Sequence, residues 1–261
     1  LPTSPDSAIG STTVIVKRKT RQTTGVLGFD YYSDSSDLID ANVNVYGMNT
    51  NLRESRLSAA RFDERDLLTL GVDGSNTARF ALGESDLAVT FGGEVFKDSQ
   101  EGRRDGAPTP GLYPDADMLI SGFYIDNQFD VTDALQLTAG VRYDSFDLSS
   151  SGGQNRTDEA LSPRFSASYR VTSWMQPYVS YAEAFNAPSL TQLYNDGIHF
   201  GANNFVPNPN LDAEKAKTWE FGTNFKADQL FTNRDSLRAK VAIFQNEITD
   251  YIEQSVTGGF S

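Results

Sequence analysis

Apolar and polar residues alternate with a period of two along most of this chain, and helical spacing is scarce. The run Leu137, Ala139, Val141 and Tyr143, separated by polar or small residues, is typical of the pattern. Alternate side chains of a strand point to opposite faces of a sheet, so this period predicts an all-β, antiparallel fold. We predict strands at 24–32, 40–48, 66–80, 86–97, 118–130, 135–147, 161–171, 174–183, 217–228 and 236–248, with an eleventh candidate at 12–18.

The connections between these strands alternate between short and long. The short ones are 33–39, 81–85, 131–134, 172–173 and 229–235, and the long, polar ones are 49–65, 98–117, 148–160 and 184–216. Outer-membrane barrels have tight periplasmic turns, long extracellular loops and strands of about nine to eleven residues that cross the bilayer. We therefore predict a transmembrane β-barrel with about ten strands in this chain, in which 184–216 is a long extracellular loop. A soluble β-sandwich adhesin is the alternative, although a sandwich has no reason for strict alternation.

Charge and residue usage exclude several other classes. The net charge of −13 disfavours nucleic acid as a partner, because phosphate binding needs clustered Lys and Arg. Cysteine is absent, so disulfides and thiolate metal sites are excluded. The sequence contains no run of eighteen apolar residues, so a membrane-spanning helix is not predicted. The mean hydropathy of −0.42 still fits a membrane barrel, because only alternate residues of its strands face lipid.

The one histidine of the chain, His199, lies near the middle of the 184–216 loop. A neutral imidazole is a ligand for haem iron, and a porphyrin also needs flat apolar contacts. Tyr194 and Phe200 flank the histidine and are candidates for those contacts. Tyr194 and Tyr181 are also secondary candidates for a phenolate ligand to the iron.

Two short boxes enclose this histidine. The first is Phe185-Asn186-Ala187-Pro188, and the second is Asn208-Pro209-Asn210-Leu211, followed by Glu214. At these residues the chain resembles the haem and haemoglobin receptors among TonB-dependent outer-membrane transporters, which carry a Phe-Arg-Ala-Pro box, an Asn-Pro-Asn-Leu box and a haem-contacting histidine between them. Asn186 stands where the family has Arg, so no propionate contact from a guanidinium is expected at that position.

The resemblance implies a receptor for haem or haemoglobin in the outer membrane of a Gram-negative bacterium, with lipid around it and His199 as an axial ligand of the iron. Such receptors place an N-terminal plug, which contacts TonB, inside a barrel of about 22 strands. Residues 1–261 show no plug, so we expect an internal fragment of the barrel. A second axial ligand would then come from elsewhere, and Arg103 and Arg104 are candidates for the propionates.

Other functions remain as alternatives. The same barrel serves receptors for ferric siderophores or host iron proteins, and a porin is a more distant alternative that needs a constriction loop. An enzyme is not expected. The acidic pair Asp63 and Glu64 would point to opposite faces of a strand, and no nucleophile elbow or phosphate-cradling glycine loop is present.

Overall fold

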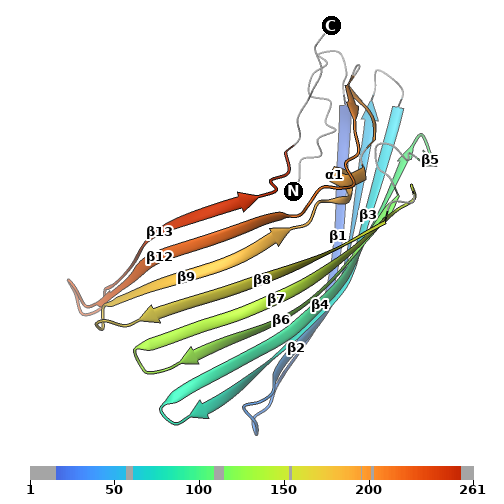
Figure 1. Ribbon diagram of the computed structural model, residues 1–261. Coiled ribbons are helices and arrows are strands. Elements are labelled where there is room, and N and C mark those ends of the chain that lie inside the picture. Colours follow the sequence, from blue (N-terminus) through green and yellow to red (C-terminus); the bar gives the residue numbers. More distant parts are fainter. Residues whose placement is uncertain are drawn as a thin grey trace.

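The computed structural model describes residues 16–56, 61–108, 115–152, 155–194, 196–200 and 203–253. Long strands form one antiparallel sheet in which each strand pairs with the next along the chain. They are β1 (Val16–Tyr32), β2 (Asp40–Arg56), β3 (Arg61–Leu82), β4 (Ser85–Arg104), β6 (Ala116–Asp130), β7 (Leu135–Ser150), β8 (Asn155–Tyr169), β9 (Met175–Asn186), β12 (Glu214–Asp228) and β13 (Ser236–Thr249). The sheet is bent like part of a barrel wall (Figure 1).

All ten predicted strands are present, and the short connections are confirmed. The prediction of long loops at 49–65, 98–117 and 148–160 was wrong, because most of these residues extend the neighbouring strands. The β2–β3 ladder, for example, continues to the pair Arg56 and Arg61. The outer face of these extensions is mainly polar, and their inner face has only isolated apolar residues such as Leu148 and Ala160. They therefore lack the regular apolar alternation that marks the middle of each strand. Of the candidate strand 12–18, residues 16–18 open β1, and 12–15 lie outside the described residues.

A further tight hairpin was missed by the sequence prediction. The two-residue strand β5 (Ala107–Pro108) pairs back onto β4 through Asp105 and Gly106. Both turn residues have positive φ, 50° and 85°. This is the conformation that Asp-Gly favours in two-residue hairpin turns, so the dipeptide was a readable signal.

The two faces of the sheet differ in chemistry. We call inner the face that carries the short helix α1 (Leu190–Tyr194) and the buried apolar cluster around it, and outer the opposite face. Large apolar side chains on the outer face are solvent-exposed on strand after strand. They include Leu27, Phe29, Val43, Val45, Leu70, Val72, Phe91, Val95, Leu119, Phe123, Val141, Leu161, Phe165, Trp219, Phe221, Val241 and Ile243. We call these residues the outer belt; a continuous apolar band of this kind is typical of a sheet that faces lipid.

No helix among the described residues is long and apolar enough to cross a membrane.

Polar side chains on the inner face bridge strands that are not neighbours. The Tyr46 hydroxyl of β2 donates to Glu94 of β4 across β3, at 3.0 Å. Arg142 of β7 reaches the same carboxylate across β6 at 3.2 Å, and it pairs with the buried Asp144 at 2.7 Å. Gly122 of β6 leaves the space through which Arg142 reaches Glu94. A Cβ at this position would lie 2.3 Å from both the Arg142 Nη2 and an Asp144 oxygen. One network therefore connects β2, β4 and β7.

We predict that Gly122→Ala in the full-length protein displaces Arg142 and destabilises the barrel by about 1–3 kcal/mol, the usual range for overpacking. The thermal midpoint, followed by heat-modifiable electrophoretic mobility in detergent, should fall. Gly25→Ala is the matched control, because a Cβ at Gly25 meets nothing within 4 Å. Equal midpoints for the two variants would contradict the assigned role of Gly122.

Candidate functional site

The connection between β9 and β12 starts with a capped helix. The Gln192 backbone N–H donates to Ser189 Oγ at 3.3 Å, and the Ser189 N–H donates to Gln192 Oε1 at 2.8 Å. These reciprocal bonds form a capping box, which satisfies backbone donors at a helix start. Pro188, almost fully buried, stands immediately before the box. The chain therefore leaves β9 in a defined turn that leads into α1.

The helix α1 packs against the inner wall. Leu193 is fully buried, and Leu190 and Tyr194 are each 5% exposed. Their partners are apolar residues of β6, β7 and β8, and we call the whole group the loop-base cluster: Ala116, Ile120, Phe146, Leu148, Ala160, Leu190, Leu193 and Tyr194. A hydrogen bond of 3.1 Å from Arg65 of β3 to Thr191 Oγ1 adds a polar contact. The helix is thereby held on the wall by several strands.

The first sequence box lies where β9 separates from β8. These two strands pair only between Arg164–Ser168 and Tyr178–Ala182. Beyond that segment the Phe185 ring meets Phe146 edge to face, with centroids 4.9 Å apart. Ala187 packs against the same cluster. The box therefore directs the end of β9 onto the loop-base cluster.

Asn186 has a partner on the strand that follows the loop. Its Nδ2 donates to Glu214 Oε2 at 2.8 Å, at the first residue of β12. The other Glu214 oxygen accepts from the Ile252 backbone N–H at 2.9 Å. At the position where the resembled family has Arg, the Asn186 amide therefore joins the first box to the start of β12.

The second box is a turn held by Arg156 of β8. The Leu211 N–H donates to the Asn208 carbonyl at 3.3 Å, and Leu211 packs on the loop-base cluster. Arg156 donates to the Pro209 carbonyl at 3.2 Å and also to the Leu211 carbonyl. An ion pair with Asp158 orients its guanidinium. Arg156 was missed by the sequence analysis, because no local pattern marks a residue that acts on a turn more than fifty positions away.

His199 belongs to a hairpin that projects from this base. Its strands are β10 (Gly197–Phe200) and β11 (Asn203–Phe205), and the pairing shifts register between Ile198 and Phe200, at His199. The side chains of His199 and Phe200 lie outside what the structure describes. A local irregularity re-aims a strand residue, and such irregularities are frequent next to functional sites.

Tyr194 is not on an open wall beside the histidine. It is buried in the loop-base cluster, and burial raises the pKa of its phenol above the ordinary value, against the opposing effect of the Arg156 charge. The phenol therefore stays protonated at neutral pH, which disfavours a phenolate ligand.

Tyr181, the other candidate for a phenolate ligand, lies away from the His199 loop. It lies in β9 with its ring 4.6 Å from Trp219 on the outer face, and its hydroxyl donates to Glu183.

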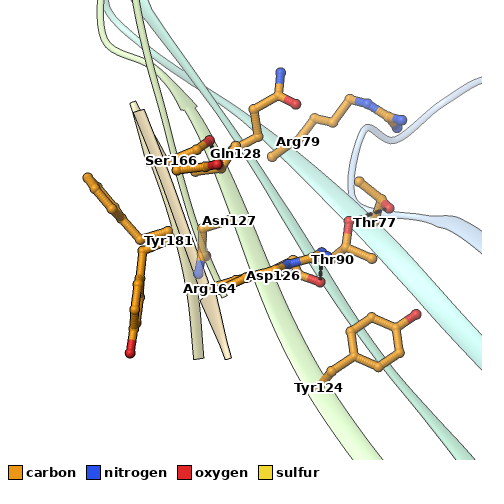
Figure 2. Close-up of a pocket in the computed structure, with 15 residues that line it drawn as sticks. Thr77, Arg79, Thr90, Tyr124, Asp126, Asn127, Gln128, Arg164, Ser166 and Tyr181 are labelled. Carbon is orange, nitrogen blue, oxygen red and sulfur yellow. Dashed lines mark hydrogen bonds and ion pairs between the residues drawn. The ribbon is translucent and has the colours of Figure 1, made fainter. Parts of the chain in front are cut away.

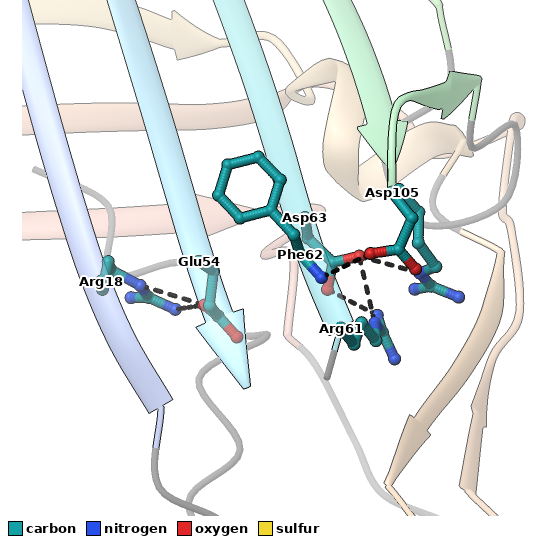
Figure 3. Close-up of polar contacts among 7 residues, drawn as sticks. Arg18, Glu54, Arg61, Phe62, Asp63 and Asp105 are labelled. Carbon is teal, nitrogen blue, oxygen red and sulfur yellow. Dashed lines mark hydrogen bonds and ion pairs between the residues drawn. The ribbon is translucent and has the colours of Figure 1, made fainter. Parts of the chain in front are cut away.

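The two candidate propionate ligands are engaged elsewhere. Arg104 pairs with the buried Asp63 at 2.8 Å. Arg61 pairs with the same carboxylate at 2.7 Å (Figure 3). Arg103 lies 3.3 Å from Glu101. Because both arginines have carboxylate partners, the structure gives no support to them as propionate ligands.

A cavity of about 790 Å³ lies on the inner face toward the short-turn end of the strands. Its lining is mainly hydroxyl, amide and charged, and includes the Arg164–Asp126 ion pair at 2.5 Å (Figure 2). Tyr181 points away from the other labelled side chains. Within the described residues, no three His, Cys, Asp or Glu side chains are grouped to hold a metal ion.

An antiparallel meander with a lipid-type outer face, a polar inner wall and an inward-packed loop is typical of outer-membrane β-barrels. A family model described as "TonB dependent receptor-like, beta-barrel" matches residues 3–261. The chain belongs to this family, whose members are outer-membrane receptors of Gram-negative bacteria, and it forms part of their barrel.

Curated relatives carry haem-related names. The chain is 30% identical over 271 residues to the "Hemin receptor" of Yersinia pestis, covering 98% of this chain and 39% of that protein. It is 29% identical over 238 residues to the "Heme/hemopexin utilization protein C" of Haemophilus influenzae strain 86-028NP, covering 86% of this chain and 33% of that protein. The chain thus spans between a third and two fifths of the length of these relatives.

A solved structure has the same fold. It is a double mutant of the Serratia marcescens hemophore receptor HasR in complex with its hemophore HasA and heme. The TM-score is 0.83 at 20% identity, over 92% of this chain and 43% of that one. At this identity the likeness shows the fold alone.

We predict that Arg156→Ala loosens the Asn-Pro-Asn-Leu turn and speeds limited proteolysis within 184–216 several-fold, because two backbone carbonyls lose a charged donor. Cleavage sites and rates can be followed by mass spectrometry on the full-length protein. Arg164→Ala is the control, since it removes the same group from the same strand at a site away from the loop. Unchanged cleavage in Arg156→Ala would show that the turn holds without this contact.

Proposed function

We propose that the full-length protein is a haem receptor of the outer membrane, which takes up haem as free haem or from haemoglobin or another haem-carrying protein. The observation that carries the proposal is the convergence of both boxes on the loop-base cluster, from which the His199 hairpin projects. The haem-related names of the curated relatives support the same cargo. A siderophore receptor on this fold would not require a histidine at that place.

In the proposed orientation, the long-loop ends of the strands face the cell exterior and the short turns face the periplasm. The outer belt lies in the hydrocarbon region. The hairpin with His199 is then presented to the medium, where haem or its carrier arrives. Transport across the membrane would be energised by TonB through a plug, which lies outside this chain in our proposal.

His199 is proposed as an axial ligand of the haem iron through its neutral imidazole, and Phe200 as an apolar contact to the macrocycle. The chain contains one histidine, so a second imidazole ligand would come from another part of the receptor or from the carrier. In this proposal Tyr194 does not contact haem; its buried side chain holds α1 on the inner face of the sheet and so supports the loop.

We expect His199→Ala in the full-length receptor to weaken haem binding about tenfold or more, because the iron loses a protein ligand. The Soret band in a haem titration measures this change, and haem-dependent growth gives a second readout. Val206→Ala, an 82% exposed residue of the same loop, is the matched control. A normal Soret titration in His199→Ala would refute the ligand assignment.

Tyr194→Phe is predicted to leave the haem spectrum unchanged, since the buried phenol is neutral and packs mainly through its ring. Tyr194→Ala should instead weaken haem binding by loosening the loop base. Both variants can be compared by Soret titration and by proteolysis of 184–216. A spectral shift in Tyr194→Phe at unchanged protease resistance would restore the phenolate hypothesis.

A further inference from the structure

Cations on the outer face occur at only one end of the strands. The strand registers and the alternation of side chains assign each strand residue to the inner or the outer face. The lysines and arginines assigned to the outer face of the described strands all lie toward the long-loop end: Lys17, Lys19, Arg21, Arg53, Lys97, Arg103, Lys215 and Lys217. Lys97 is level with the belt residues Leu70 and Leu119, and the other seven lie beyond the belt. At the short-turn end, cations of the described strands, such as Arg79, Lys226 and Arg238, are on the inner face.

Six of these eight outer cations belong to β1, β2 and β4. Lys19 is directly opposite Arg53 in the β1–β2 ladder. Arg53 is opposite Glu64, and Glu64 is opposite Arg103. With strands about 4.8 Å apart, this row crosses four strands within roughly 15 Å. Four outer acids lie among or beside the six cations, Glu64, Asp66, Glu101 and Asp117, so the sector is still net positive.

Several cations of the sector are already paired on the sheet. Arg53 contacts Glu64 at 2.8 Å, Arg103 contacts Glu101 at 3.3 Å, and Lys97 contacts Asp117 at 3.1 Å.

The cations of β1 differ from these. Lys17, Lys19 and Arg21 are exposed and have no acidic partner among the residues that the structure describes. Along the strand they are spaced by about 7 Å. We call these three residues the β1 triad. On the same face of β1 they are followed, after Thr23 and Gly25, by Leu27 and Phe29 of the outer belt.

We propose that the β1 triad, supported by the net positive sector beside it, binds phosphate groups of the lipid in the outer leaflet. Arg21 lies nearest the outer belt, six residues before Leu27, and Lys19 and Lys17 lie about 7 Å and about 13 Å farther along the strand. The triad therefore extends from the edge of the belt into the zone of the lipid headgroups. Guanidinium and ammonium groups form charge-assisted hydrogen bonds with phosphate, and basic residues next to an anionic lipid surface strengthen binding additively. The orientation of this surface rests on the proposed function; its charge pattern does not.

The direct test compares full-length wild-type protein with the triple variant K17Q/K19Q/R21Q. The probe is phosphorylated lipopolysaccharide in mixed micelles with neutral detergent, titrated against thermal stability and against co-purified lipid phosphate. We expect the triple variant to bind the lipid about tenfold to a hundredfold more weakly, with a shallower dependence on salt. The control R79Q/K226Q/R238Q removes the same charge from the inner face and should bind as the wild type does.

Three outcomes would overturn the proposal: wild-type affinity in the β1 triad variant, an equal loss in the control, or equally tight binding of dephosphorylated lipopolysaccharide. Displacement of the lipid by inorganic phosphate at similar concentrations would identify a site for the free anion instead. Heat-modifiable mobility checks that each variant is folded. Haem titration of the same variant separates the two proposals, because the β1 triad variant should bind haem normally even if His199→Ala does not.

Discussion

An unbroken antiparallel ladder is the constraint on which the rest of this structure depends. Backbone N–H and C=O groups that face lipid must be bonded within the protein, and a long meander bonds them strand to strand. The ladder assigns every second side chain to one face. The outer belt, the polar inner wall and the position of each cation therefore follow from one register. A slip of one residue in any strand would exchange its two faces.

The inner wall uses this register in two ways. In the middle of the sheet, Glu94 of β4 contacts Tyr46 of β2 and Arg142 of β7, which belong to strands that do not pair with β4. The absence of a side chain at Gly122 leaves room for Arg142 to reach Glu94. At the long-loop end, the same face becomes apolar and receives α1. Along a single strand, the inner face thus changes from polar in the middle to apolar at the long-loop end. Residues of both sequence boxes pack on this apolar part.

Sequence reasoning located the strand middles because an apolar belt alternates with polar residues there. It misjudged the strand ends, where the outer face is mainly polar and the few apolar residues of the inner face, such as Leu148 and Ala160, are too isolated to show a period of two. The burial of Tyr194 was not predicted, although Ser189 and Gln192 already marked the start of a helix and a helix that packs on a sheet buries one side. The role of Arg156 was not predictable, since its partners are backbone carbonyls brought close only by the completed sheet.

The contact between Arg156 and the Asn-Pro-Asn-Leu turn separates the anchoring of the loop from its exposed surface. The guanidinium meets main-chain oxygens, while the side chains of Asn208 and Asn210 remain exposed. Anchorage of the turn therefore depends on the path of the backbone, which Pro209 restricts. The exposed side chains of the turn are left available for contacts of their own, while the attachment of the loop to the barrel wall stays the same.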